Sequence, residues 1–159
     1  MPNTVILALG NPLRGDDGVG AAVLEQLGRS ALPKTVALLD GGTVGLALVL
    51  LLNPYQHAII IDAAAMGEPP GTWRRFSLAE VCLQAHDMAL RGTLHYAGLA
   101  EALLLGEALN MLPPQITIFG IQPAVTTWEI GLSNAVQAAV PSVCTAILEL
   151  LNYGENTCH

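Results

Sequence analysis

The 159-residue sequence has few charged residues, and basic residues are especially scarce. Charged residues make up 12% of the chain, and 6 Lys and Arg stand against 13 Asp and Glu, so the net charge is −7. Proteins that bind nucleic acid or an anionic membrane surface carry a basic patch, which this composition does not supply. Disordered chains are poor in apolar residues, whereas 52% of this chain is hydrophobic. The composition therefore predicts a folded chain whose partners are not nucleic acids.

Cysteines and long hydrophobic runs are also scarce. Cys82, Cys144 and Cys158 are too few, and too widely spaced, for a disulfide framework. The longest apolar run, Val44–Leu52, is much shorter than the roughly 20 residues that a membrane-spanning helix requires. The first residues lack the basic segment of a signal peptide and continue directly into a strand pattern. We therefore expect reduced thiols, no membrane span and a cytoplasmic location.

Short apolar runs alternate along the chain with segments of helical periodicity. Runs typical of buried strands are 5–9, 35–39, 58–61, 72–76 and 116–121, and helical segments are 19–27, 45–52, 95–109 and 136–150. Arg74 and Arg75 place the fourth of these strands at a sheet edge. The alternation predicts a three-layer α/β/α fold with a mostly parallel sheet. No linker or repeat divides the sequence, so we expect a single domain over residues 1–159.

Ligands of such folds bind beyond the carboxyl ends of the strands, so the residues expected at a site are 10–17, 40–43, Asp62 and Gln122-Pro123. The glycine-rich loop that follows the first strand, Gly10–Gly20, contains neither Gly-x-Gly-x-x-Gly nor Gly-Lys-Ser/Thr. Asp16 and Asp17, at the entrance of the next helix, would repel a phosphate but attract a cation. A structural role is equally compatible with the spacing. It is favoured for Asp16 as the N-cap of the helix, with Asp17 in the first turn.

Two more residues are candidates for the same site. Asp62 follows a run of three isoleucines, and an acid that ends a buried strand either caps a loop or serves a ligand. His95 begins a helical segment, and a neutral imidazole is a common metal ligand. Two carboxylates and one histidine suit a divalent transition metal. The other histidines, His57, His86 and His159, are expected to be solvated.

Six motifs in order connect the chain to a known family. They are Gly10-Asn11-x-Leu13-x-x-Asp16-Asp17-Gly18-x-Gly20, Leu39-Asp40-Gly41-Gly42-Thr43-x-Gly45, Ile60-Ile61-Asp62-Ala63, Pro70-Gly71-Thr72, Leu94-His95-x-x-Gly98-Leu99 and Gly120-x-x-Pro123. In these motifs the sequence resembles the hydrogenase maturation endopeptidases, from about Asn3 to Leu151. The resemblance implies an α/β/α sandwich with a twisted, mixed sheet of about five strands, and it is compatible with an antiparallel edge strand.

The resemblance also implies a site. The metal-contacting residues of the family fall on Asp17, Asp62 and His95, which are then both the catalytic and the metal-binding residues. Many members have Glu where this chain has Asp17, so the shorter side chain requires an adjustment of the loop. Asp16 and Asn11 are expected to shape that loop. No family motif matches residues 82–91.

The implied activity is that of an aspartic-type endopeptidase. Such enzymes remove the C-terminal extension of the [NiFe] hydrogenase large-subunit precursor after nickel insertion, and the nickel belongs to the precursor as its recognition mark. We therefore expect a cytoplasmic monomer that does not hold nickel permanently. The sequence does not decide whether Asp17 or Asp62 is the general base, or whether the metal polarises the carbonyl or a water.

Several further expectations follow from the same residues. Asp40 and Thr43 are expected to line the cleft, and part of the apolar excess to form an exposed patch near Asp62 that docks the substrate. Two other functions use the same features: a nickel-checking protein without peptidase activity, and a nucleotide-binding module built on the glycine-rich loop.

Overall fold

A five-stranded mixed sheet forms the centre of the molecule. The structure, a computed structural model, describes residues 2–43, 45–81, 97–124 and 126–156. The strands are β1 (Thr4–Leu9), β2 (Val36–Gly42), β3 (His57–Ala63), β4 (Trp73–Ser77) and β5 (Gln115–Ile121). Their order is β2-β1-β3-β5-β4, and all neighbours are parallel except β4, which pairs antiparallel with β5 at one edge. The predicted mixed sheet with an antiparallel edge strand is confirmed.

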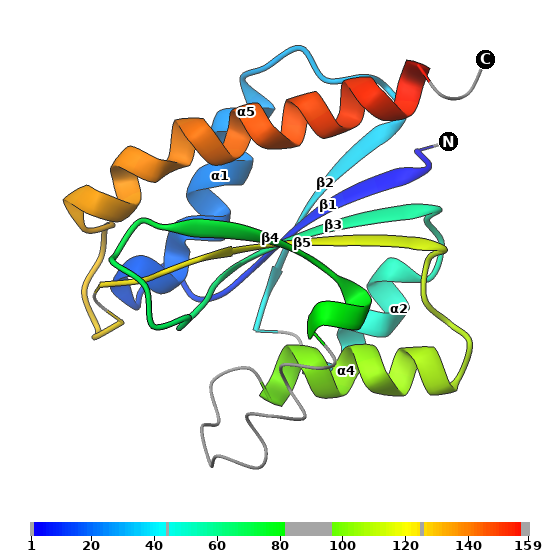
Figure 1. Ribbon diagram of the computed structural model, residues 1–159, viewed down its shortest axis with the longest axis horizontal. Helices are drawn as coiled ribbons and strands as arrows, with labels where there is room; N and C mark the ends of the chain where they lie inside the picture. Colours follow the sequence, from blue (N-terminus) through cyan, green and yellow to red (C-terminus); the bar gives the residue numbers. More distant parts are fainter. Residues whose placement is uncertain (1, 44, 82–96, 125, 157–159) are drawn as a thin grey trace.

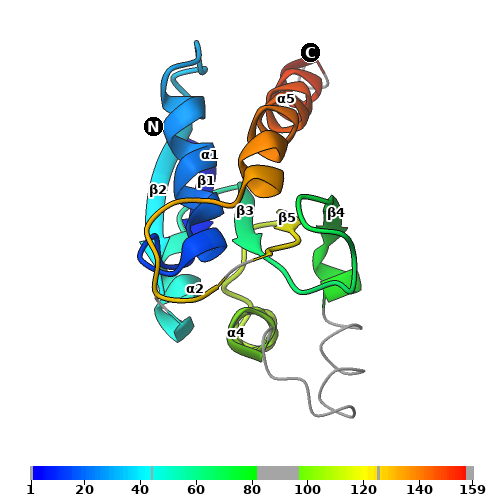
Figure 2. The same cartoon turned by 90° about the vertical axis from the view of Figure 1, so that its left-hand side faces the viewer.

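Helices cover both faces of this sheet. They are η1 (Gly15–Gly18), α1 (Val19–Gly28), η2 (Gly45–Ala47), α2 (Leu48–Leu52), α4 (Ala97–Ala108) and α5 (Asn134–Asn156), and residues 78–81 are also helical. Figures 1 and 2 show α1 and α5 on one face and α2 and α4 on the other. A separate apolar core fills each side. The three-layer α/β/α architecture is therefore as predicted.

The two central strands, β1 and β3, explain why strands could be recognised in the sequence as short apolar runs. Residues 5–8 of β1 and 58–61 of β3 are all buried, as expected for parallel strands that are covered on both faces. Successive side chains point to opposite faces, so Ile61 joins the core against α1 and α5, and Ile60 joins the core against α2 and α4. Each fully buried Ile or Leu contributes about 1.5–3 kcal/mol.

The last helix, α5, packs its apolar stripe against the first core. Val136, Val140, Val143 and Ile147 are buried there, at the predicted helical spacing. In the described part of the chain, its segment Asn134–Asn152 is long and apolar enough to cross a membrane by length and composition, with a mean hydropathy of 1.4. The core helix of a globular domain passes the same test, and 33% of this segment is buried in the domain.

Candidate active site at the carboxyl end of the sheet

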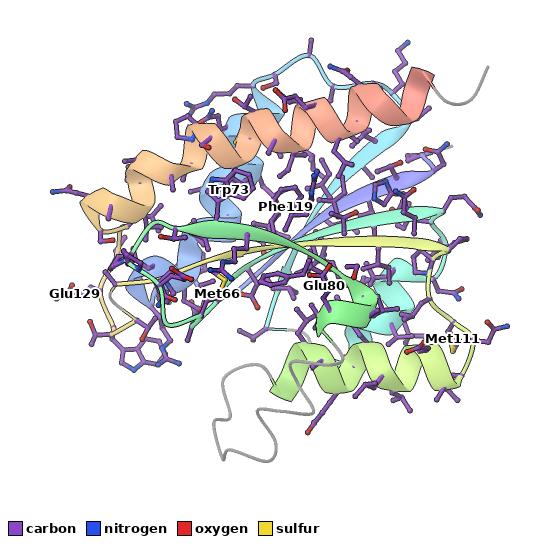
Figure 3. All side chains as sticks on the ribbon, viewed as in Figure 1. Met66, Trp73, Glu80, Met111, Phe119 and Glu129 are labelled. Atoms are coloured by element: carbon purple, nitrogen blue, oxygen red, sulfur yellow. The ribbon has the colours of Figure 1, made fainter. Side chains whose placement is uncertain are left out.

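Asp17 and Asp62 come from neighbouring parallel strands and meet at one end of the sheet. Asp62 is the penultimate residue of β3, and Asp17 lies in η1, which follows β1. The loops after β3 and β5 lie at this end, as the labels of Met66 and Glu129 show in Figure 3. The negative charge of Asp17 acts on the carboxyl group of Asp62. The structure thus brings together two of the three predicted site residues.

Close packing of α1 on the strand ends allows Asp17 to lie near Asp62. A Cβ on Gly20, in the first turn of α1, would lie 3.0 Å from the carbonyl oxygen of Leu9 and 3.1 Å from that of Ile61. The first turn of α1 therefore rests directly on the ends of β1 and β3. Any side chain at Gly20 would push the helix, and the η1 turn before it, away from Asp62.

The loop before η1 is fixed by Gly10 and Asn11. Gly10 has φ of +110°, and a Cβ there would overlap the carbonyl oxygen of Asp17. The Asn11 backbone N–H donates to Oδ2 of Asp17 at 2.7 Å, and the Asn11 side chain accepts from the N–H of Leu13 at 3.0 Å. These bonds confirm that Asn11 shapes the loop, and they hold one oxygen of the Asp17 carboxyl group.

Asp62 has an unusual environment for a carboxyl group. Burial, followed by the nearby charge of Asp17, raises the pKa of Asp62 to about 7, although a hydrogen bond from the backbone of Ala63 opposes the shift. In the register of β3 with β5, Asp62 stands opposite Gly120, which has no side chain to cover that flank. Asp17 and Asp62 therefore form a pair that can bind a cation or exchange a proton at neutral pH.

His95 lies outside the described residues, as do His86, His159, Cys82 and Cys158. The described helix α4 begins two positions later, at Ala97, at the same end of the sheet as Asp62 (Figure 1). It packs on the face of the sheet to which Ile60 and, by alternation, Asp62 belong. Within the described ranges, no group of three His, Cys, Asp or Glu residues is placed to hold a metal ion. The described site is therefore a two-carboxylate pair.

Asp16 has a different role from the predicted helix cap. Gly18 is the N-cap of α1, and no side chain caps it. Asp16 is fully buried instead, and its carboxyl group accepts hydrogen bonds from the N–H of Ala124 at 2.8 Å and from the N–H and hydroxyl of Ser133 at 2.7 and 2.8 Å. The prediction of an N-cap was wrong because the buried oxygens of Asp16 are used by distant backbone donors. Asp16 ties η1 to the loop after β5.

Gln122 is one of the residues that the sequence places just beyond a strand, where ligand sites are expected. It directly follows β5, and its Oε1 accepts from the N–H of Met66 at 2.6 Å and from the N–H of Glu68 at 3.3 Å. The side chain therefore fixes the loop that follows Asp62. Gln122 thus lies at the carboxyl end of the sheet, as expected, and supports the loop that follows Asp62.

Asp40 and Thr43 are exposed at the end of β2. Asp40 accepts a hydrogen bond from the N–H of Gly42 at 3.0 Å and so stabilises the turn. Gly42 in turn accepts from the N–H of Gly10 at 2.8 Å, which joins this turn to the loop of Asp17. Both residues lie at the carboxyl end of the sheet, as expected, and their predicted place in the cleft stays a prediction.

Two other titratable groups do not form part of the site. Cys144 is buried in α5, and burial raises its pKa to about 11, so it is no activated thiolate. His57 was expected to be solvated, but it is half-buried, with Nε2 3.1 Å from the hydroxyl of Thr117, and burial lowers its pKa. His57 begins β3, whereas Asp62 lies near the end of the same strand.

The chain is similar to proteins of hydrogenase maturation. The model of the hydrogenase maturation protease family matches residues 21–150, which contain Asp62 and His95 and begin after Asp17. The hydrogenase expression/formation protein HupD of Rhizobium leguminosarum bv. viciae is 31% identical over 156 residues, 96% of this chain and 76% of HupD. The hydrogenase 2 maturation protease of Escherichia coli is 31% identical over 150 residues, 92% of this chain and 89% of that protein.

Solved structures agree with this similarity. The hydrogenase maturating endopeptidase HybD from E. coli superimposes with a TM-score of 0.84 at 29% identity, over 97% of this chain and 94% of HybD. The [NiFe] hydrogenase maturation protease HybD from Thermococcus kodakarensis gives a TM-score of 0.68 at 29% identity, over 95% and 99% of the two chains. The expected fold is therefore that of known peptidase structures.

Proposed function

The chain belongs to the hydrogenase maturation protease family, and on this basis we propose that it removes the C-terminal extension of a [NiFe] hydrogenase large-subunit precursor after nickel has been inserted. Family membership makes it a peptidase of hydrogenase maturation. The nickel dependence rests on one observation in this chain, the pairing of Asp17 with Asp62 at the carboxyl end of the sheet.

In this proposal, Asp17, Asp62 and His95 contact nickel that the precursor carries. Two carboxylates and one imidazole are suitable ligands for such an ion. A permanent structural site is usually closed by four protein ligands, and three ligands leave positions for groups of the precursor. The positive charge of the ion would also favour the ionised form of Asp62, whose pKa is raised in the free protein by burial and by Asp17. The nickel is thus part of the substrate and not a resident cofactor.

The reaction is the hydrolysis of one peptide bond. Water attacks the carbonyl carbon, the bond from carbon to nitrogen breaks, the hydroxyl of the water stays on the carbon as part of the new carboxyl group, and one proton of the water ends on the leaving amine. We assign the general base to one of the two carboxylates, since both lie at the end of the sheet where the substrate must bind. Asp17→Asn and Asp62→Asn distinguish the roles. The variant that lacks the general base should have a lower kcat but still bind the precursor, and a variant that lacks only a nickel contact should bind the precursor more weakly.

The decisive experiment compares precursor with and without nickel. Purified protein is incubated with each form of the large-subunit precursor of the same organism, and mass spectrometry follows the loss of the C-terminal extension. We expect cleavage of the nickel-loaded form alone, and loss of cleavage in folded His95→Ala. Equal cleavage of both forms would contradict the nickel dependence. Binding without any mass loss would instead support the nickel-checking protein without peptidase activity.

The proposal includes a monomeric protein that acts in the cytoplasm, where it processes the precursor after nickel insertion. Sedimentation of the purified protein tests the first point, with a mass near 16.6 kDa as the expected result. Fractionation of cells that express the full chain tests the second, and recovery in the membrane fraction would contradict it.

A further inference from the structure

Three large apolar side chains stand in solvent beside η1. Leu13 is 54% exposed, Trp128 is 72% exposed and Ile130 is 86% exposed. The guanidinium of Arg14 lies over the Trp128 ring, 5.3 Å from its centroid. We call these four residues, Leu13, Arg14, Trp128 and Ile130, the η1 patch. Trp and Arg are among the residue types most enriched at the hot spots of protein interfaces.

The η1 patch is held in place from below. The backbone N–H of Gly15 donates to the carbonyl oxygen of Glu129 at 2.6 Å, between Trp128 and Ile130. Asp16 accepts hydrogen bonds from Ala124 and Ser133, on either side of the same loop. The exposed side chains therefore stand on a backbone that is bonded to the turn carrying Asp17. A surface held in this way loses little conformational entropy when a partner binds.

The η1 patch lies at the same end of the sheet as the site and is joined to it through the chain. Leu13 and Arg14 belong to the same loop as Asp17, and the loop of Glu129 lies at the same end of the sheet as Met66, which follows Asp62 (Figure 3). A folded partner that brings a metal ion to Asp17 and Asp62 must lie against the surface beside them. The η1 patch is that surface on the side of the loop after β5.

The charge of the η1 patch defines the partner further. Arg14 is one of 6 basic residues in a chain of net charge −7. Among the residues that the structure describes, the ion pairs are Arg29 with Glu25 and Arg74 with Glu68, so Arg14 has an aromatic ring as its contact and no carboxylate. It can therefore meet an acidic group of the partner at the rim of an apolar contact.

We propose that the η1 patch is the docking surface for the folded body of the large-subunit precursor, which presents apolar side chains and one carboxylate next to its cut site. This inference rests on the proposed function, since it names where the same substrate binds. It assigns the three apolar side chains to substrate affinity and gives them no part in bond cleavage.

The experiment measures processing of the nickel-loaded precursor by Trp128→Ser/Ile130→Ser. We expect KM to rise roughly ten-fold or more while kcat is unchanged, because the two side chains touch the substrate away from the reacting atoms. The matched control is Leu50→Ser/Leu109→Ser, which alters two leucines that are 67% and 56% exposed, one in α2 and one just after α4. Its KM should equal that of the wild type. Thermal unfolding should be the same for all three proteins.

Each other result counts against a defined part of the inference. If the wild type cleaves the precursor and Trp128→Ser/Ile130→Ser cleaves it with the same KM, the docking surface is overturned and the proposed function is left intact. An equal rise in the control variant also overturns it, because the effect would not be local. A wild-type dimer that Trp128→Ser/Ile130→Ser abolishes would show that a second copy covers the η1 patch. If the wild type neither binds nor cuts the precursor, the proposed function and the docking surface fail together.

Discussion

Asp62→Asn should make the metal-free protein more stable in alkaline solution while it removes the activity. The pKa of Asp62 in the folded protein is raised from 3.8 to about 7 by burial and by the charge of Asp17. In the unfolded chain, Asp62 ionises near its ordinary pKa. The folded state therefore binds this proton more tightly, and ionised Asp62 opposes folding.

The sign and the size of the effect follow from these two values. Below pH 3.8, Asp62 is protonated in both states and carries no penalty. As the pH rises, the unfolded chain ionises first, so the free energy of unfolding falls until the folded group also ionises near pH 7. A difference of about 3 pKa units corresponds to about 4 kcal/mol, which is an upper limit because local relaxation reduces it. This is a large part of the 5–15 kcal/mol that is usual for a domain.

The assay is urea unfolding of wild type and Asp62→Asn with a chelator, followed by circular dichroism at pH 4, 6 and 8. We expect a variant-minus-wild-type difference near zero at pH 4 that grows with pH to about 2–4 kcal/mol at pH 8. Asp40→Asn is the control, because it removes the same charge from an exposed position at the same end of the sheet. The reasoning is refuted if Asp62→Asn brings the same gain at every pH, or none at pH 8.

Three further changes test the framework of the site. Asp16→Asn places an amide N–H₂ group among the donors that now bond to the buried carboxyl group. The free energy of unfolding should therefore fall by about 1–3 kcal/mol in urea titrations. An unchanged value would refute the role of Asp16 in holding η1 to the loop after β5. Gly20→Ala should cost about 1–3 kcal/mol and reduce processing, because its Cβ meets two strand ends at 3.0–3.1 Å. Gly28→Ala lies in the same helix with its nearest neighbour at 3.8 Å, and should not destabilise the protein. Burial raises the pKa of Cys144 to about 11, so this thiol should react with a thiol reagent at pH 8 only when urea unfolds the chain. Rapid labelling of Cys144 in the native protein, detected by peptide mapping, would contradict this expectation.

The fold could be predicted because the central strands are covered on both faces. Runs such as residues 58–61 are apolar throughout, and the parallel arrangement follows from their alternation with helical segments. The same logic placed Asp17 and Asp62 together, since the carboxyl ends of neighbouring parallel strands meet at one end of the sheet. The sequence also placed Asn11 correctly, because it lies within the same short loop as Asp17.

The supporting contacts of the site could not be predicted in this way. Asp16 is bonded to backbone N–H groups 108 and 117 positions away, and a backbone donor has no sequence signature. Trp128 and Ile130 are residue types that usually lie inside a domain, yet both are exposed. Their exposure follows from a loop without helical or strand periodicity, whose course depends on those distant bonds.

The tie made by Asp16 has a consequence for the order of folding during synthesis. Its donors, Ala124 and Ser133, are made long after Asp16, Asp17 and Asp62 have left the ribosome. The strand that leads to them, β5, lies between β3 and β4 and pairs with both. Contacts of such high sequence separation form late, because the long intervening loop must close first. A nascent chain can therefore expose both carboxylates but cannot fix η1 to its partner loop until Ser133 has been made, so the site is assembled more than a hundred residues after Asp16 is synthesised.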